Sequence, residues 1–317
     1  MSDEAKLCAA CETVLAGRYC HACGQDSLAK PAPLREMAIQ VATSYSPVDG
    51  KLARTIAVLA TRPGRLLEAY RSGAGSLYVT PMKLFVASTA LFLAVLNFSD
   101  TTLFQYVWKV DEPGRAVRAV YDPETMMVSV IGATESDRWL QPRIEPAIDP
   151  EVTAAIAAAA RDGANEATRA NMRYELVAND EQEKVATRLS SWLPNLLWLL
   201  MPLYALALVP LFGRHRLFLE HVIFAMWAHA VAFLLAMVMA AINSRGANLA
   251  APWLALPYLG YFTVAAARYY DMRPLQALWR GVAHLTVYVF LVLAPTAIIV
   301  LATVTNWTAL WQVLMTS

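Results

Sequence analysis

The chain has 317 residues, of which 57% are hydrophobic and only 16% are charged. An ordinary soluble domain is about a quarter charged and has no long apolar runs, so this composition excludes a purely soluble protein. The net charge of +1 conceals an asymmetry, because residues 1–83 hold ten Lys/Arg and seven Asp/Glu, whereas residues 99–190 hold ten and sixteen. The sequence therefore indicates an integral membrane protein with two soluble parts of opposite charge.

All four cysteines lie in the first 23 residues, as two Cys-x-x-Cys pairs separated by eight residues. Each pair can turn both thiolates toward one point, and Gly24 lets the backbone fold back after the second pair. Four thiolates complete a tetrahedral zinc site with bonds of about 2.3 Å. Such a short segment has no core, so metal binding would supply most of its folding energy. We predict a zinc ribbon over residues 1–30, in which Zn²⁺ is structural and its ligands are Cys8, Cys11, Cys20 and Cys23.

Other readings of this head are weaker. An iron–sulfur cluster stays open as a minor alternative, whereas disulfide pairing does not fit a head in a reducing compartment. His21 lies inside the second pair and is not needed as a ligand. Nucleic-acid binding is disfavoured, because the head has only Lys6, Arg18 and Lys30 to contact phosphates. The first thirty residues also lack the apolar core of a signal peptide, so we expect internal helices to drive membrane insertion.

Residues 31–81 carry the pattern of short amphipathic helices beside a membrane crossing. Apolar residues at helical spacing predict helices over Leu34–Tyr45, Lys51–Thr61 and Arg65–Arg71. A turn at Ser46–Gly50 and the Arg62-Pro63-Gly64 break separate them. Packing on the transmembrane bundle is favoured over lipid sensing for these helices.

Several residues of this stretch occur together in a known pattern. Cys-Gly-Gln at residues 23–25 is followed by Asp49, Lys51, Thr55, Arg62-Pro63-Gly64, Tyr70, Gly73, Tyr78 and Pro81. With these residues, positions 8–98 resemble a bacterial membrane-protein family of unknown function that has an N-terminal zinc ribbon. The resemblance implies no reaction. Members usually carry an Arg two residues after the glycine, where this chain has Gly75, so a lipid-phosphate or partner contact of that Arg would be lost or supplied by Arg71.

Hydrophobic runs predict about five transmembrane helices. The first is residues 82–98, which is near the minimum length for crossing a hydrocarbon core of about 30 Å. A membrane block over 191–317 supplies the others, at residues 189–213, 222–243, about 252–267 and 282–304.

Residues 99–190 are predicted to form a small α+β domain. Short apolar or alternating runs at 104–110, 116–121 and 126–131 favour strands, and 138–149 reads as a loop. Asp149-Pro150-Glu151 is expected to cap a helix through 154–160, and a second helix over about 166–189 leads into the membrane. The domain contains no His or Cys, which excludes His- or Cys-based catalysis on that side. The fold class is thus an α-helical polytopic membrane protein with a zinc ribbon and an extracytoplasmic α+β domain.

Loop charges predict the orientation. Five arginines lie in two short loops, and only Arg245 lies in the opposite short loop. By the positive-inside rule, the N-terminus is cytoplasmic and residues 99–190 are outside the inner membrane of a bacterium. The five arginines are Arg214, Arg216, Arg268, Arg273 and Arg280.

Three functions compete, and none has a complete motif. We favour a non-enzymatic membrane scaffold or adaptor, embedded in the lipid bilayer, whose head docks a cytoplasmic protein partner. A small transporter or channel would use the Pro-rich second crossing and His229, an ionisable group inside the bilayer, although His221, His229 and His284 read better as neutral side chains bonded to neighbouring helices. An enzyme acting on lipid at the membrane interface would need His215, Glu220, His221 and Asp271 to converge.

Overall fold

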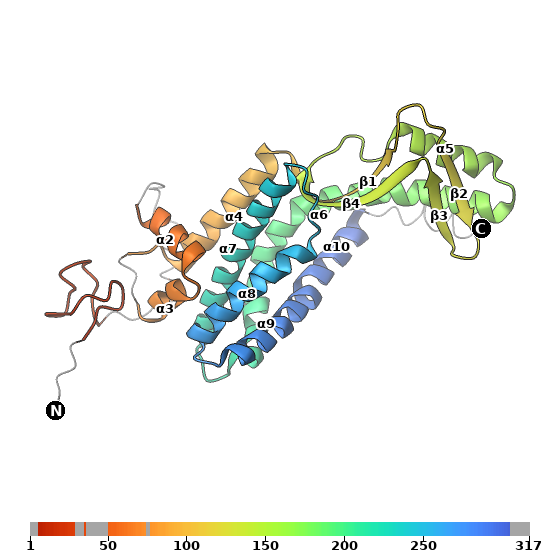
Figure 1. Ribbon diagram of the computed structural model, residues 1–317. Coiled ribbons are helices and arrows are strands. Elements are labelled where there is room, and N and C mark those ends of the chain that lie inside the picture. Colours follow the sequence, from red (N-terminus) through yellow and green to blue (C-terminus); the bar gives the residue numbers. More distant parts are fainter. Residues whose placement is uncertain (1–5, 29–34, 36–49, 74–76, 305–317) are drawn as a thin grey trace. The chain divides into compact units, whose positions relative to one another are not determined.

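A computed structural model describes residues 6–28, 35, 50–73 and 77–304 (Figure 1). The helix expected over Leu34–Tyr45 lies outside the described residues. The chain forms two compact units. We call the first the helical unit; it is built from Met1–Ala94, Leu197–Met237 and Pro252–Leu293. The second, the mixed unit, is built from Val95–Leu196, Val238–Ala251 and Ala294–Ser317.

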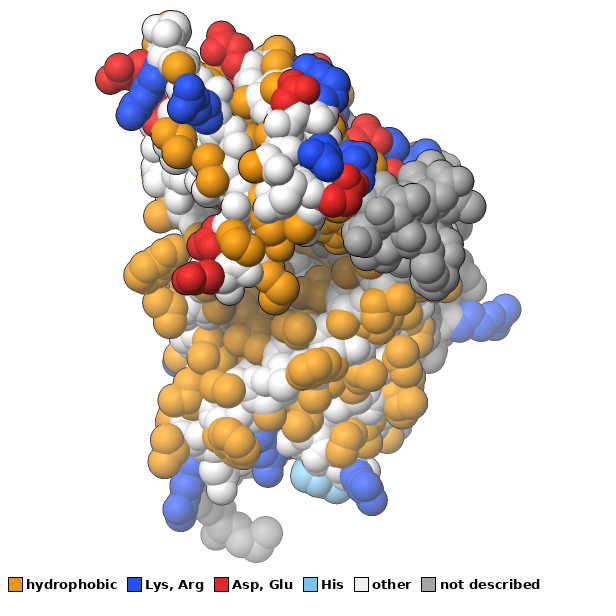
Figure 2. Space-filling model, turned by 90° about the vertical axis from the view of Figure 1, so that its right-hand side faces the viewer, with side chains coloured by type: hydrophobic (Ala, Val, Ile, Leu, Met, Phe, Trp, Pro, Cys, Tyr) orange, Lys and Arg blue, Asp and Glu red, His pale blue; other side chains and the backbone are white. Residues whose placement is uncertain are grey.

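Long apolar helices dominate the chain, and those of the helical unit lie side by side (Figure 1). Figure 2 shows that hydrophobic side chains, interspersed with uncharged groups, predominate on the surface of the long helices in that view. Large apolar side chains such as Trp279 and Phe290 are 70% and 69% exposed, as expected for a surface that meets lipid rather than water. Apart from α5, which belongs to the mixed unit, the α-helices in the described part of the whole chain are α2 Gly50–Thr61, α3 Arg65–Arg71, α4 Pro81–Phe98, α6 Glu166–Phe212, α7 Phe218–Asn243, α8 Pro252–Tyr269, α9 Pro274–Tyr288 and α10 Ala294–Val304.

Three of these segments are long and apolar enough to cross a membrane. They are Pro81–Phe98, Phe218–Asn243 and the continuous run Pro274–Thr303. Leu199–Phe212 is a shorter apolar segment. Helix α8 is continuous, but it contains several tyrosines, Pro257 and Arg268, which make it less apolar than the three spans. A polytopic membrane fold is therefore supported by three spans, and the five crossings expected from the sequence stay a proposal.

The last span differs from its predicted bounds. The helix begins at Pro274 rather than near residue 282, and so includes Arg280. Between α9 and α10 the chain makes a π-helical turn at Val289–Leu293, which is followed by Pro295. Proline has no N–H to continue the helical pattern, and a π-helical turn is a common way to accommodate such a break.

The mixed unit contains two antiparallel two-stranded sheets. One pairs β1 (Thr101–Val110) with β4 (Ala133–Pro142), and the other pairs β2 (Arg118–Asp122) with β3 (Met127–Ile131). The three predicted strands are present, but the loop predicted from Arg138 is wrong for its first part, because β4 runs to Pro142 opposite Thr101. Charged residues at exposed positions of β4 hid its alternation, and pairing with β1 supplies its backbone hydrogen bonds.

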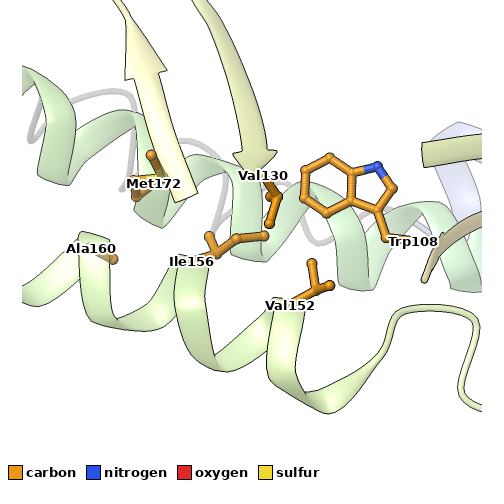
Figure 3. Packing of buried hydrophobic residues seen from close by; sticks show 6 residues of the cluster. All are labelled: Trp108, Val130, Val152, Ile156, Ala160 and Met172. Atoms are coloured by element: carbon orange, nitrogen blue, oxygen red, sulfur yellow. The ribbon is translucent and has the colours of Figure 1, made fainter. Parts of the chain in front are cut away.

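The core of the mixed unit lies between strands and helices (Figure 3). Helix α5 (Pro150–Asp162) places Val152 and Ile156, both fully buried, against Trp108 of β1 and Val130 of β3. Met172, from the first part of α6, completes the cluster together with Ala160. The helical spacing of these α5 residues gives a single apolar stripe.

Asp149 joins β1 to α5 in an unexpected way. It stands at the start of α5, but its carboxylate does not cap that helix. Instead it accepts hydrogen bonds from Lys109 Nζ (2.7 Å) and from the Val110 backbone N–H (2.8 Å). The bond to Lys109 is the main reason why the pKa of Asp149 lies below its usual value.

We therefore expect Asp149→Asn to destabilise the full chain at pH 7 by about 1 kcal/mol, because the pair is partly exposed. The carboxylate is stabilising above its unfolded-state pKa, so this contribution is lost as the pH falls through the acidic range. Thermal unfolding of the chain in detergent should show a gap between variant and wild type that closes toward pH 3. Asp137→Asn, on the exposed face of β4, is the control and should match wild type at both pH values.

Gly64 sets the approach of α3 to α8. It precedes α3 with φ 83°, and a Cβ built there would lie 3.2 Å from Ala265 Cα and 3.3 Å from Arg268 Cβ. The Arg268 guanidinium also donates a hydrogen bond to the Pro63 carbonyl (3.1 Å). A left-handed backbone against another helix requires glycine here.

Gly64→Ala should lower the unfolding midpoint, with a cost of about 1–3 kcal/mol from strained backbone and close contact. The matched control is Gly260→Ala in α8, where an added Cβ meets nothing within 4 Å and helix propensity favours alanine. Equal midpoints for the two variants would contradict this account of Gly64.

Candidate metal centre and its platform

The head consists of two hairpin turns with the same hydrogen-bond pattern. In the first, Cys8 N–H donates to Thr13 O (2.8 Å), and in the second, Cys20 N–H donates to Gln25 O (2.8 Å). Isolated bridges, Leu7 to Val14 and Tyr19 to Asp26, close the two turns. Each turn thus presents its two cysteines on a tight backbone loop, as expected for a zinc knuckle.

The residue after each second cysteine has a left-handed backbone. Gly24 has φ 72°, and Glu12, at the equivalent place in the first turn, has φ 64°. Their N–H groups donate to the carbonyls of Cys20 (2.8 Å) and Cys8 (2.9 Å). The left-handed backbone of Gly24 could be predicted from the sequence. That of Glu12 could not, because a non-glycine residue rarely takes this conformation.

The four sulfur atoms lie within 4.8 Å of one another. The Sγ atoms of Cys8 and Cys23 are 3.6 Å apart, and those of Cys11 and Cys20 are 3.5 Å apart. Ligands that are about 2.3 Å from a tetrahedral zinc are about 3.8 Å from each other, and the sulfur of a disulfide is far closer, at about 2.05 Å. The four thiols form no disulfide, so the geometry fits a metal site.

Burial and hydrogen bonding differ between the two members of each pair. The first cysteines, Cys8 and Cys20, are 2% exposed, and the second ones are half-buried. Hydrogen bonds with the Thr13 hydroxyl and backbone lower the pKa of Cys11 to about 6, and burial raises the pKa of Cys23 to about 12. A bound metal ion would hold all four as thiolates, so its binding releases protons.

Two contacts attach the head to α3 and to the residues just after it. Gln25, only 5% exposed, donates a hydrogen bond from Nε2 to the carbonyl of Gly73 (2.9 Å). Glu12 forms an ion pair with Arg65 of α3 (2.7 Å). Because Glu12 and Gln25 follow the second cysteine of their turns by one and two residues, each turn carries one of the two attachments.

The segment between α3 and α4 is fixed by buried side chains. The backbone N–H of Val79 donates to the hydroxyl of Thr55 in α2 (3.1 Å), and the carbonyl of Val79 accepts from the hydroxyl of Tyr70 in α3 (2.8 Å). Thr55 is fully buried and Tyr70 is 6% exposed. We call α2, α3 and the start of α4 the platform, since these bonds make them one structural piece.

The platform contacts the loop between α8 and α9, and this loop is bonded in turn to the loop between α6 and α7. Arg71 of α3 donates to the Tyr269 carbonyl (2.7 Å) and to Asp271 (3.0 Å), and Arg216 also donates to Asp271 (2.8 Å). The bond from Arg216 is the main cause of a lowered Asp271 pKa. The family resemblance suggested that Arg71 could contact a lipid phosphate or a partner protein. In the structure, Arg71 instead binds groups of the chain itself.

The residues considered for lipid chemistry do not form a set. Asp271 pairs with the two arginines, and Glu220 lies 4.0 Å from Arg216. His221 contacts the Tyr270 hydroxyl (3.0 Å) and the Gly213 carbonyl. Among the described residues, no hydrogen bond joins any two of His215, Glu220, His221 and Asp271.

The two deeper histidines are bonded to neighbouring helices. His229 Nδ1 donates to the Ala225 carbonyl (2.8 Å), so its Nε2 accepts from the Tyr288 hydroxyl (3.1 Å). His284 lies 2.8 Å from the Tyr204 hydroxyl and 3.1 Å from the Tyr258 hydroxyl. None of these tyrosines stands out in the sequence, because no spacing links residues on four different helices.

The class of protein that emerges is a mainly helical protein with three candidate membrane spans and a head, fixed on the platform, whose four cysteines could hold a metal ion. Residues 49–93, which cover α2, α3 and most of α4, match a family described as "Protein of unknown function (DUF3667)". The resemblance drawn from the sequence is confirmed over that stretch. No curated protein matches the chain. No solved structure matches it.

We expect the purified full chain to bind one Zn²⁺ per molecule, and Cys11→Ser or Cys20→Ser to abolish stoichiometric binding, because the site loses one of four thiolates. Elemental analysis after purification without chelator measures this. The control is His21→Ala, which changes an exposed side chain between two ligands and should keep full metal content. Iron with visible charge-transfer absorption would instead support the iron–sulfur alternative.

Proposed function

We propose that this protein is a non-enzymatic membrane adaptor whose zinc-bound head docks a cytoplasmic protein. The observation that carries the proposal is the attachment of the head. Gln25 and Glu12 fix it on the platform, next to membrane-spanning helix α4. A head that was only a folding aid would need no such attachment.

The exposed side of the head supports partner docking. Four large apolar side chains are more than half exposed in a segment that has very little core of its own. Val14 and Leu7 are cross-strand partners in the first turn, so their side chains share a face. Exposed apolar groups on a rigid surface are typical of interaction sites. They are Leu7 59%, Val14 53%, Tyr19 61% and Leu28 69%.

The ligand set favours a structural ion over a catalytic one. Four thiolates fill all positions of a tetrahedral zinc, whereas catalytic zinc sites keep a position for water or substrate. We therefore assign Zn²⁺ a structural role. The metal would hold the two turns in the arrangement that exposes their apolar side chains.

The proposed topology has five crossings of a bacterial inner membrane, with the head in the cytoplasm and residues 99–190 outside. Contacts at one end of the helical unit support it. Arg71 joins α3 to the loop between α8 and α9, and Arg216 joins that loop to the one between α6 and α7. The head's platform and both arginine-bearing loops thus share one side, as the positive-inside rule requires.

Transport ranks lower than docking. Its main support in the sequence is His229, and both ring nitrogens of this residue have hydrogen-bond partners. A buried histidine with satisfied nitrogens is explained by packing alone.

The test is cross-linking and pull-down of the full chain from native membranes, with zinc measured on the same samples. Cys20→Ser should lose both zinc and the partner. Val14→Asp should lose the partner and keep zinc, because Val14 is exposed and not a ligand.

Ile131→Asp is the matched control, since Ile131 is 56% exposed in β3 of the mixed unit. It should keep both zinc and the partner. A partner list that is the same for wild type, Cys20→Ser and Val14→Asp would overturn the adaptor proposal.

A further inference from the structure

An apolar cavity of about 300 Å³ lies within the helical unit, between α2 and two membrane-spanning helices. Helix α2 contributes three residues, α4 four and α7 one. Its volume is at the lower end of the range for sites that hold small ligands. The lining residues are Leu52, Ile56, Leu59, Leu84, Ala87, Ser88, Leu91 and Leu234.

The side chains that line the cavity suit a hydrocarbon occupant rather than a polar one. Seven of the eight residues are apolar, and the hydroxyl of Ser88 already donates to the Phe85 carbonyl (3.0 Å). A cavity without polar partners does not hold ordered water. Leu91 is 47% exposed, so the cavity reaches the flank of the unit, where lipid chains would surround α4.

The cavity lies at the depth where the acyl chains of a bilayer begin, just below the headgroups. Its α4 residues follow Pro81 by three to ten positions, which is about 5–15 Å along the helix. Helix α2 covers this part of α4, and the bond from Val79 N–H to Thr55 fixes it there. The cavity therefore begins just below the level at which α4 enters the membrane.

Positive charge surrounds that level. Residues 50–83 contain six Lys/Arg and one Asp/Glu. Lys51 and Arg54 are exposed on α2, and Lys83 lies in the first turn of α4, on the same face as Ala87 one turn later. Within the described part of the chain, none of these three forms an ion pair with a carboxylate. Cations at the membrane interface attract anionic lipid headgroups.

We propose that the cavity binds one acyl chain of an anionic phospholipid, with the headgroup phosphate near Lys83 at the start of α4. The lipid fills the space between α2 and α4 that protein side chains leave empty. Burial of hydrocarbon supplies affinity, and the Lys83 ammonium supplies the preference for negative charge.

The test uses the full chain in detergent, mixed with either dioleoyl phosphatidylglycerol or dioleoyl phosphatidylcholine, and counts bound lipid by native mass spectrometry. Wild type should retain one phosphatidylglycerol at least tenfold more often than phosphatidylcholine. Ala87→Trp should reduce this retention at least tenfold, because the indole occupies the cavity. Lys83→Gln should remove the preference for phosphatidylglycerol and keep weak binding of both lipids.

The control is Ala90→Trp, which adds the same side chain at an exposed position of α4 that does not line the cavity. It should retain lipid as wild type does. The thermal midpoint of each variant is recorded with and without phosphatidylglycerol. Wild type and Ala90→Trp should gain stability from the lipid, and a correctly folded Ala87→Trp should not.

Two results would overturn the proposal. One is equal lipid retention by Ala87→Trp and Ala90→Trp, which would mean that the bound lipid does not occupy the cavity. The other is equal retention of the two lipids by wild type, which would show that the site does not prefer an anionic headgroup. If Ala87→Trp does not fold, the smaller substitution Ala87→Leu replaces it in the same comparison.

Discussion

The backbone of Val79 is the point on which the platform depends. This residue lies just before α4, one of the three candidate membrane spans. Unpaired backbone groups are costly beside a membrane, and residues 77–80, the described end of this link, have no regular secondary structure to pair them. Thr55 and Tyr70 supply the missing partners, and both lie in the stretch that matches the DUF3667 family. Fixing these two side chains also fixes α2 and α3, and with them the head and the apolar cavity.

Much of this arrangement follows from the sequence, since helices need only local periodicity. The Cys-x-x-Cys spacing located the thiol cluster, and apolar runs located α4, α7 and the start of α8 at Pro252. The strand from Ala133 was missed, because its partner β1 lies some thirty residues away and that pairing supplies its backbone hydrogen bonds. Local patterns carry no information about such partners.

The contacts between elements were outside the reach of sequence reasoning for the same reason. The sequence marks Gln25 only as the last residue of the Cys-Gly-Gln motif and does not reveal its partner. Its hydrogen bond to Gly73 spans 48 residues. The phenols that bond His229 and His284 come from three helices, α6, α8 and α9. An intramembrane histidine looks functional when its partners are unknown, and the hydrogen bonds of these two give a structural reason for their burial.

The two attachments of the head have a thermodynamic consequence for the metal. Glu12 contacts α3 and Gln25 contacts Gly73 just after it, in the same conformation that gathers the four thiols. Docking and metal binding are therefore coupled equilibria, and coupling is reciprocal. Any free energy of coupling between docking and metal binding therefore appears as tighter binding of the ion. The platform thus contributes to the metal affinity of the head, although it supplies no ligand. A peptide of the head alone would bind the metal less tightly than the full chain.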